Sequence, residues 1–112
     1  MKDLCMMEKE KLIGQLKCPK CDNMLSVEQI LGNCTISWPH KDWILLKCPL
    51  CNEFSHVEIV TDKLSTGVLD GAPGPSFFPC SEIFLNEFDV YKTSEFIECK
   101  YNDKKYKFKS KE

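Results

Sequence analysis

The clearest pattern along the chain is a series of short runs of β-branched, aromatic and aliphatic residues with turn signals between them. Residues 35–38 run Thr-Ile-Ser-Trp and residues 43–46 run Trp-Ile-Leu-Leu, while the Pro-His-Lys-Asp between them is typical of a turn. Residues 54–61 are rich in valine, isoleucine and threonine. The pattern predicts three strands here, and the first two form a hairpin.

The C-terminal part alternates apolar and polar residues on both sides of an Asn-Asp turn at 102–103. Between 97 and 101 the apolar positions alternate with glutamate and lysine, and between 104 and 109 they alternate with lysine. This period of two predicts a β-hairpin with one apolar face and one lysine-rich face. Residues 82–91 are compatible with one further strand.

Two other stretches are predicted as short helices. Residues 2–15 carry a weak helical period, which predicts a short N-terminal helix. Ser26 is followed three places later by Gln29, which forms a capping box, and Gly32 suits the end of a helix of one or two turns.

Residues 63–79 differ from the rest because glycine and proline are concentrated in their second half, STGVLDGAPGPSFFP from 65 to 79. This composition predicts a shaped loop without regular structure. Two interpretations stay open: a linker between two parts of the molecule, or a binding loop with Phe77 and Phe78 at its tip.

Composition narrows the class of protein. The 112 residues are 43% apolar, which is ordinary for one globular domain, and the chain contains no apolar run long enough to span a membrane. The first residues are charged and lack the apolar stretch of a signal peptide, so we expect a cytoplasmic location. All fifteen basic residues are lysine in a chain of net charge −2, and the absence of arginine argues against a protein that reads bases.

Eight cysteines is a high number for a cytoplasmic protein, because thiols stay reduced in that compartment and disulfides are rare. Cysteines of cytoplasmic proteins more often bind a metal or take part in catalysis. Four of them lie in two similar stretches, LKCPKC at 16–21 and LKCPLC at 46–51. The other four do not share this pattern, and we interpret them as small buried apolar residues: Cys5, Cys34, Cys80 and Cys99.

Each Cys-x-x-Cys turn can place two sulfurs on one ion, and two such turns complete the four ligands that zinc prefers. The spacer between Cys21 and Cys48 has 26 residues, somewhat longer than the usual spacer of about 15–20. The spacing therefore predicts one structural Zn²⁺ per chain, held by four thiolates: Cys18, Cys21, Cys48 and Cys51. Substitution of Cys34 for one of these ligands stays a mixed alternative.

KCPKC at 17–21 and KCPLC at 47–51, joined by a predicted hairpin, resemble the paired knuckles of the zinc-ribbon class. The resemblance covers residues 16–62 and implies a β-rich module in which the four cysteines hold one zinc ion. We expect a small β-rich α+β protein: a zinc ribbon of antiparallel strands with the N-terminal helix and the C-terminal hairpin. All 112 residues would form one compact domain, divided into the zinc-ribbon part, the loop at 63–79 and a β-strand and hairpin part at 80–112.

Enzymatic uses of these residues fit less well. A thiol redox site needs a strand–helix–strand frame that the pattern does not predict. A zinc deaminase would use His56 and Glu58 with Cys80, but the second cysteine of that motif is replaced by Ile83. His40 or His56 as a metal ligand, and Cys80 with His56 as a nucleophile pair, are weaker alternatives because four thiolates already complete a shell. We therefore expect no enzymatic activity.

Two functions in binding remain. The first is docking on another protein, anchored by aromatic residues in turns and loops: Trp38, Trp43, Phe77 and Phe78. The second is nucleic-acid binding by the lysine-rich and aromatic C-terminal hairpin, through Lys105, Lys107, Lys109 and Tyr106. The near-neutral charge and the absence of arginine favour the protein partner.

Overall fold

The computed structural model describes residues 10–11, 15–70, 76–86 and 88–111. In chain order the described elements are β1 (Glu10–Lys11), β2 (Gln15–Lys17), β3 (Met24–Ser26), α1 (Val27–Gly32), β4 (Cys34–Trp38), the 3-10 turn η1 (Pro39–Lys41), β5 (Trp43–Lys47), β6 (Phe54–Val60), β7 (Lys63–Asp70), β8 (Ser76–Phe84), β9 (Asp89–Lys92), β10 (Phe96–Tyr101) and β11 (Lys104–Ser110). Neither helical element within these ranges has the length or the apolar run needed to span a membrane.

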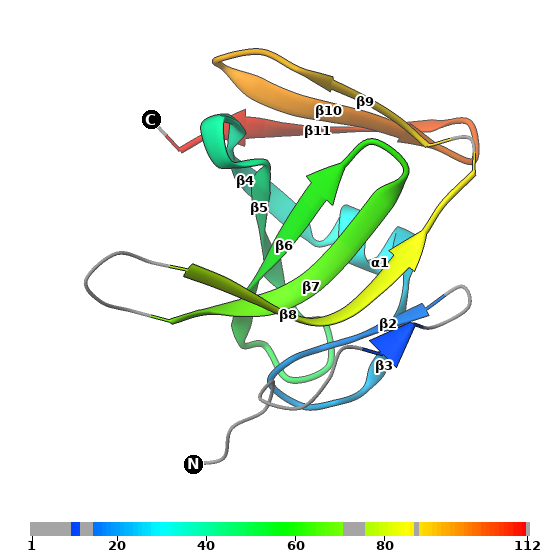
Figure 1. Cartoon of the computed structure of the whole chain (residues 1–112), viewed down its shortest axis with the longest axis vertical. Coiled ribbons are helices and arrows are strands. Elements are labelled where there is room, and N and C mark those ends of the chain that lie inside the picture. The colour runs from blue at the N-terminus through cyan, green and yellow to red at the C-terminus, as the bar shows by residue number, and fades with distance from the viewer. Residues whose placement is uncertain (1–9, 12–14, 71–75, 87, 112) are drawn as a thin grey trace.

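Nine strands form one sheet in the order β1-β8-β7-β6-β5-β4-β11-β10-β9, and β2 and β3 form a separate two-stranded sheet. Most neighbours are antiparallel, but β11 runs parallel to β4, which joins the C-terminal hairpin to the middle of the sheet. The large sheet curls, with β9–β11 across the top of the view, β6–β8 below them and α1 behind β7 (Figure 1).

The core fills the inside of this curl. Alternate residues of β5, β6, β10 and β11 point inward and meet the buried face of α1, because a β-strand places every second side chain on the same face. The larger fully buried side chains come from both parts of the sheet, from α1 and from β2–β3: Leu16, Leu25, Val27, Ile30, Leu31, Ile44, Leu46, Val57, Ile59, Leu64, Ile97 and Phe108. One continuous core therefore holds the helix, the small sheet and the large sheet together.

The predicted α+β class is wrong, since the described residues are almost entirely β. The only helical elements among them are the six-residue α1 and the three-residue η1. The helix-bearing zinc ribbon is wrong as well, because the strands of the ribbon part are mostly members of a larger sheet, in which β5 and β6 pair with strands on both sides. The short hydrophobic runs in the sequence predicted strands but could not show how many would join one sheet.

The predicted N-terminal helix at 2–15 lies mostly outside the described residues, and its described positions are strands instead. Residues 10–11 form β1 and Gln15 begins β2. In β2, Leu16 pairs with Leu25 of β3, and both are fully buried. Strand pairing and burial at this position outweigh a helical period that was weak from the start.

The segment 63–79 was predicted to be an irregular loop, but it contains β7 and the start of β8, which pair from Lys63 to Asp70. Only residues 71–75 between them are not described. Gly67 and Pro79 face each other at a register shift after Thr66. A bulge is a place where a sheet tolerates glycine and proline, so these two residues mark an irregular position in a hairpin and do not end it.

Several local predictions are confirmed. Ser26 caps α1, with its hydroxyl accepting from the Gln29 amide while the Gln29 side chain accepts from the Ser26 amide. The C-terminal hairpin turns at Asn102 and Asp103, which both adopt positive φ as a tight hairpin turn requires. All the described non-glycine residues with positive φ are aspartate or asparagine, the residue types that tolerate this conformation best: Asp22, Asp42, Asn52, Asp62, Asn102 and Asp103.

Gly67 in β7 and Gly32 in α1 provide a matched pair for testing how closely β7 and β8 approach each other. A Cβ added at Gly67 would lie 2.3 Å from the Phe78 carbonyl oxygen and 2.8 Å from the Phe77 ring, whereas a Cβ at Gly32 would meet nothing within 4 Å. We expect Gly67→Ala to lower the free energy of unfolding by about 2 kcal/mol or more through overpacking. Gly32→Ala, in α1, should raise it by about 0.5 kcal/mol. Urea unfolding of both variants checks this, and equal stabilities would contradict the close approach at Gly67.

Candidate metal centre

The two cysteine turns have the same backbone structure. In the first, the Cys18 amide donates to the Asn23 carbonyl at 2.9 Å, and the Asp22 amide donates to the Cys18 carbonyl at 2.9 Å. In the second, the Cys48 amide donates to the Glu53 carbonyl at 3.0 Å, and the Asn52 amide donates to the Cys48 carbonyl at 2.9 Å. The repeated sequence therefore folds into a repeated knuckle.

The residue after each second cysteine explains how the knuckle closes. Asp22 and Asn52 both have φ of 63°, which turns the chain back toward the next strand. Each knuckle also directs an amide at its first sulfur: the Lys20 amide at Cys18 Sγ and the Leu50 amide at Cys48 Sγ, both at 3.3 Å. Amide donors of this kind stabilise thiolate charge, so the backbone is arranged for ionised sulfur.

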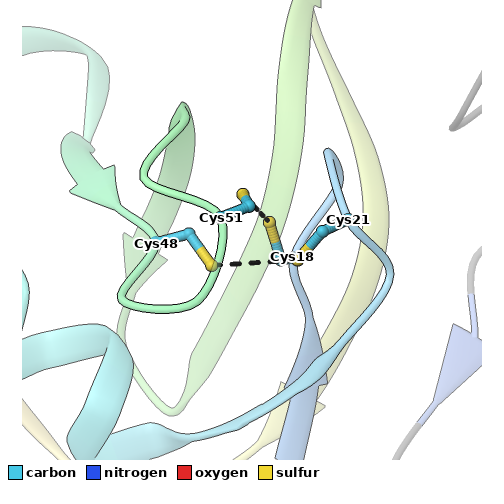
Figure 2. A group of neighbouring side chains, drawn as sticks. All are labelled: Cys18, Cys21, Cys48 and Cys51. Carbon is cyan, nitrogen blue, oxygen red and sulfur yellow. Dashed lines mark hydrogen bonds between the residues drawn. The ribbon is translucent and has the colours of Figure 1, made fainter.

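The sulfurs of the two knuckles face each other (Figure 2). Cys18 Sγ lies 3.8 Å from Cys51 Sγ, and Cys21 Sγ lies 3.9 Å from Cys48 Sγ. All four sulfurs lie within 4.8 Å of one another. A metal–sulfur bond of about 2.3 Å in a tetrahedron requires sulfurs about 3.8 Å apart, so the cluster has the size of a four-thiolate metal site.

The two thiols of the first knuckle differ in how readily they ionise. Burial raises the pKa of Cys18 to about 12, although hydrogen bonds from the Lys20 and Cys21 amides act in the opposite direction. Burial acts to raise the pKa of Cys21 as well, but hydrogen bonds from the Asn23 amide and side chain outweigh it and lower that pKa to about 7. Four thiolates within 4.8 Å of one another would repel, so positive charge placed between them would favour their ionised form.

A polar network attaches the first knuckle to the large sheet. The Thr66 hydroxyl on β7 donates to the Lys17 carbonyl at 2.8 Å, and the Ser81 hydroxyl on β8 accepts from the Lys17 amide at 3.0 Å. The two hydroxyls are 2.7 Å apart, and both residues are fully buried. Sequence reasoning missed these residues because nothing along the chain indicates that β7 and β8 meet β2.

The remaining cysteines and the histidines lie outside this cluster, which is the only group of metal-capable side chains among the described residues. Cys34 and Cys99 are buried in the core, as predicted, and Cys34 Sγ donates to the Ile30 carbonyl at 3.0 Å. Cys80 is only half-buried on β8, and Cys5 lies outside the described residues. His56 packs between the rings of Trp38 and Trp43, with centroids 5.5 and 5.9 Å away, and exposed His40 is part of η1.

The four aromatic residues predicted to anchor a protein partner lie in different environments. Trp43 is only 9% exposed and packs against Phe77, with ring centroids 6.2 Å apart, so this pair contributes to the sheet surface. Trp38 is partly exposed beside His56. Phe78 is 44% exposed on β8. The structure therefore leaves Phe78 and part of Trp38 open to solvent.

The residues predicted to contact nucleic acid lie on two faces of β11. Lys105, Lys107 and Lys109 are exposed on the outer face. Tyr106 alternates with them, and its partly buried ring packs against the core, so it cannot act together with the three lysines. The alternation was visible in the sequence, and it placed tyrosine and lysine on opposite faces.

Comparison with known proteins gives no relative: no protein-family model, curated protein or solved structure matches this chain. The resemblance to zinc ribbons therefore depends on the knuckles and on the geometry of the four sulfurs.

The network at β7 and β8 can be tested with two neighbouring hydroxyls. Thr66→Val would remove the hydrogen bond to the Lys17 carbonyl and the one shared with the Ser81 hydroxyl, and should cost about 1–3 kcal/mol of stability. Ser65 is also buried, but its hydroxyl has no partner among the described residues, so Ser65→Ala should change stability by less than about 0.5 kcal/mol. Unfolding of the metal-loaded variants in urea measures both. A neutral Thr66→Val would show that the network does not anchor the knuckle.

Proposed function

We propose that this chain is a non-catalytic binding protein whose fold is held by one structural zinc ion. The observation that supports the proposal best is the closeness of the four sulfurs within 4.8 Å, supplied by two knuckles with the same hydrogen bonds. Four protein ligands complete a tetrahedral shell, and such closed sites are structural because no position remains for substrate or water. The residues that would hold the ion are Cys18, Cys21, Cys48 and Cys51.

Zinc fits this ligand set better than most metals, since four thiolates in a tetrahedron select zinc or iron. The ion would supply positive charge among four closely placed sulfurs, and it would join β2–β3 to β5–β6. Binding energy at a structural site becomes folding energy, on the order of 10 kcal/mol in small zinc domains. In a chain of 112 residues that is comparable to the whole stability.

The partner that we propose for this protein is another protein, docked at the metal end of the molecule. Apolar side chains are exposed beside both knuckles: Leu50 is 55% exposed at the second knuckle, and Phe54 is 54% exposed just after it. Met24 holds the equivalent place after the first knuckle and is 38% exposed. Large apolar side chains that stay exposed are typical of protein interfaces.

The metal assignment predicts one equivalent of zinc per chain in the purified protein. Replacing Cys18 and Cys48 together with serine should abolish metal retention and, with it, cooperative unfolding, because each knuckle loses one ligand. The matched control is Cys34→Ala, which removes a buried cysteine that donates to the Ile30 carbonyl and should keep a full equivalent of zinc. Elemental analysis with a thermal melt measures both properties.

Three results would contradict this assignment. The first is a full metal equivalent in the double serine variant, and the second is loss of metal from Cys34→Ala, which would indicate the mixed ligand set. The third is iron in the wild-type protein, which would retain the site but change its chemistry from structural to redox.

The docking surface predicts a partner that depends on the apolar residues at the metal end. Leu50→Ser with Phe54→Ser should remove the captured partner from affinity purifications of the metal-loaded chain while leaving its melting temperature nearly unchanged, because both side chains are exposed. Phe84→Ser, an exposed phenylalanine on β8, is the matched control and should retain the partner. Equal capture by all three proteins would remove the metal end as the interface.

A further inference from the structure

The opposite end of the molecule carries a groove of different character. It lies between the turn that joins β9 to β10 and the outer face of β11, and its volume is about 520 Å³. A second hollow of about 440 Å³ continues from it toward η1, and the two share Ser94 and Ser110 as lining residues. Figure 1 shows β9–β11 at the top of the molecule, away from β2 and β3.

Positive charge runs along the face of β10 and β11 on which this groove lies. The outer face of β10 and β11 carries Lys100, Lys105, Lys107 and Lys109, opposed by Asp89 and Glu98 on the same face. Four positive and two negative charges leave +2 there, in a chain whose total is −2. Lys107 and Lys109 line the groove directly, together with one acid, Glu95. Among the described residues, Lys105 and Lys109 form no ion pair that would neutralise them.

Aromatic rings lie on the same face as these lysines. Phe96 forms part of the groove wall, and the ammonium of Lys107 lies 4.3 Å from the centroid of its ring. Tyr91, on the edge strand β9, is 61% exposed, and its ring centroid is 6.0 Å from that of Phe96. Two neighbouring rings beside a row of lysines offer flat surfaces for bases and cations for phosphates.

We propose that this groove binds single-stranded nucleic acid without sequence preference. Exposed rings accept bases that are unstacked, which favours single strands over duplex. Lysine neutralises phosphate as a point charge, and the absence of arginine removes the side chain that reads bases most often. An acidic peptide would satisfy the lysines equally well, but it would leave the pair of rings at Phe96 and Tyr91 without a role.

This inference goes beyond the structural zinc site and the docking surface at the metal end. It concerns β9, β10 and β11, whose described residues contribute no ligand to the cysteine cluster. The aromatic residues of this site are Phe96 and Tyr91, which share a face with the lysines; Tyr106, expected from the sequence, lies on the opposite face.

The test is fluorescence anisotropy of the metal-loaded full chain with labelled ten-nucleotide oligo-dT and oligo-U. The same series includes a ten-base-pair duplex and a labelled deca-glutamate peptide. We expect both single strands to bind at low salt and the duplex and the peptide to bind at least tenfold more weakly. The logarithm of the affinity should fall linearly with the logarithm of salt concentration, by about 0.7 for each phosphate neutralised.

Two variants assign the binding to the groove. Lys107→Gln with Lys109→Gln should weaken single-strand binding about tenfold or more and reduce the salt slope by about 1.4, since two phosphate contacts are lost. Phe96→Leu keeps an apolar side chain but removes the ring, and should weaken binding by roughly tenfold without changing the salt slope. The charge-matched control is Lys47→Gln with Lys63→Gln, on β5 and β7, which should bind as the wild type does.

Four outcomes would overturn the proposal. They are absence of single-strand binding at low salt, equal losses in the groove variants and the charge-matched control, tighter binding of the duplex, and tighter binding of deca-glutamate, which would assign the groove to an acidic protein segment. Binding of oligo-dT alone, oligo-U alone or both supports the proposal and identifies the ligand as DNA, RNA or either. Melting temperature and zinc content are recorded for each variant, so that loss of fold is distinguished from loss of contact.

Discussion

The rest of the structure depends on the meeting of four sulfurs at one point. These sulfurs come from two knuckles separated by 26 residues in the chain, one between β2 and β3 and the other between β5 and β6. A metal ion held tetrahedrally by these sulfurs would fix where the two knuckles lie relative to each other, and it would also close the loop that contains α1 and β4. Crosslinking such a loop removes conformations from the unfolded chain, which stabilises the folded state independently of any packing gain.

That constraint explains the position of the small sheet. The β2–β3 pair has only three residues in each strand, and an isolated two-stranded sheet is marginally stable in water. Three interactions hold it to the large sheet: the sulfur cluster, the Thr66–Ser81 network and the burial of Leu16 and Leu25. The cluster also lies at the boundary between the hydrophobic core and solvent, because Cys18 and Cys48 are fully buried while Cys21 and Cys51 are partly exposed.

Sequence predicted those parts of the fold that depend on neighbours in the chain. The knuckles, the capping box at Ser26 and the C-terminal hairpin are all encoded within about a dozen residues, and the structure contains each of them. The strands of β7 and β8 were missed because Gly67 and Pro79 suggest a loop unless one knows that they face each other across a bulge. The parallel pairing of β11 with β4 joins residues about seventy positions apart, and no local pattern contains that information.

The same distinction applies to the functional residues. The cysteine cluster could be predicted because metal coordination requires particular residue types at a fixed spacing. The binding surfaces could not, because they depend on which face of a strand is left uncovered. Trp43 and Phe77 were predicted as possible anchors for a partner, but their rings pack against each other. Phe54, Tyr91 and Phe96 were not predicted as binding residues; Phe54 and Tyr91 are exposed and Phe96 is partly exposed.

The two ends of the molecule therefore differ in a way that follows from the curl of the sheet. The end that carries the cysteine cluster exposes three large apolar side chains among polar ones: Met24, Leu50 and Phe54. The end formed by β9–β11 is held by strand pairing and the core, and its outer face carries lysines and rings. The second knuckle and β9–β11 belong to the same nine-stranded sheet, and the first knuckle joins them through the shared core, so an ion at the cysteine cluster would stabilise the one folded unit that carries both surfaces.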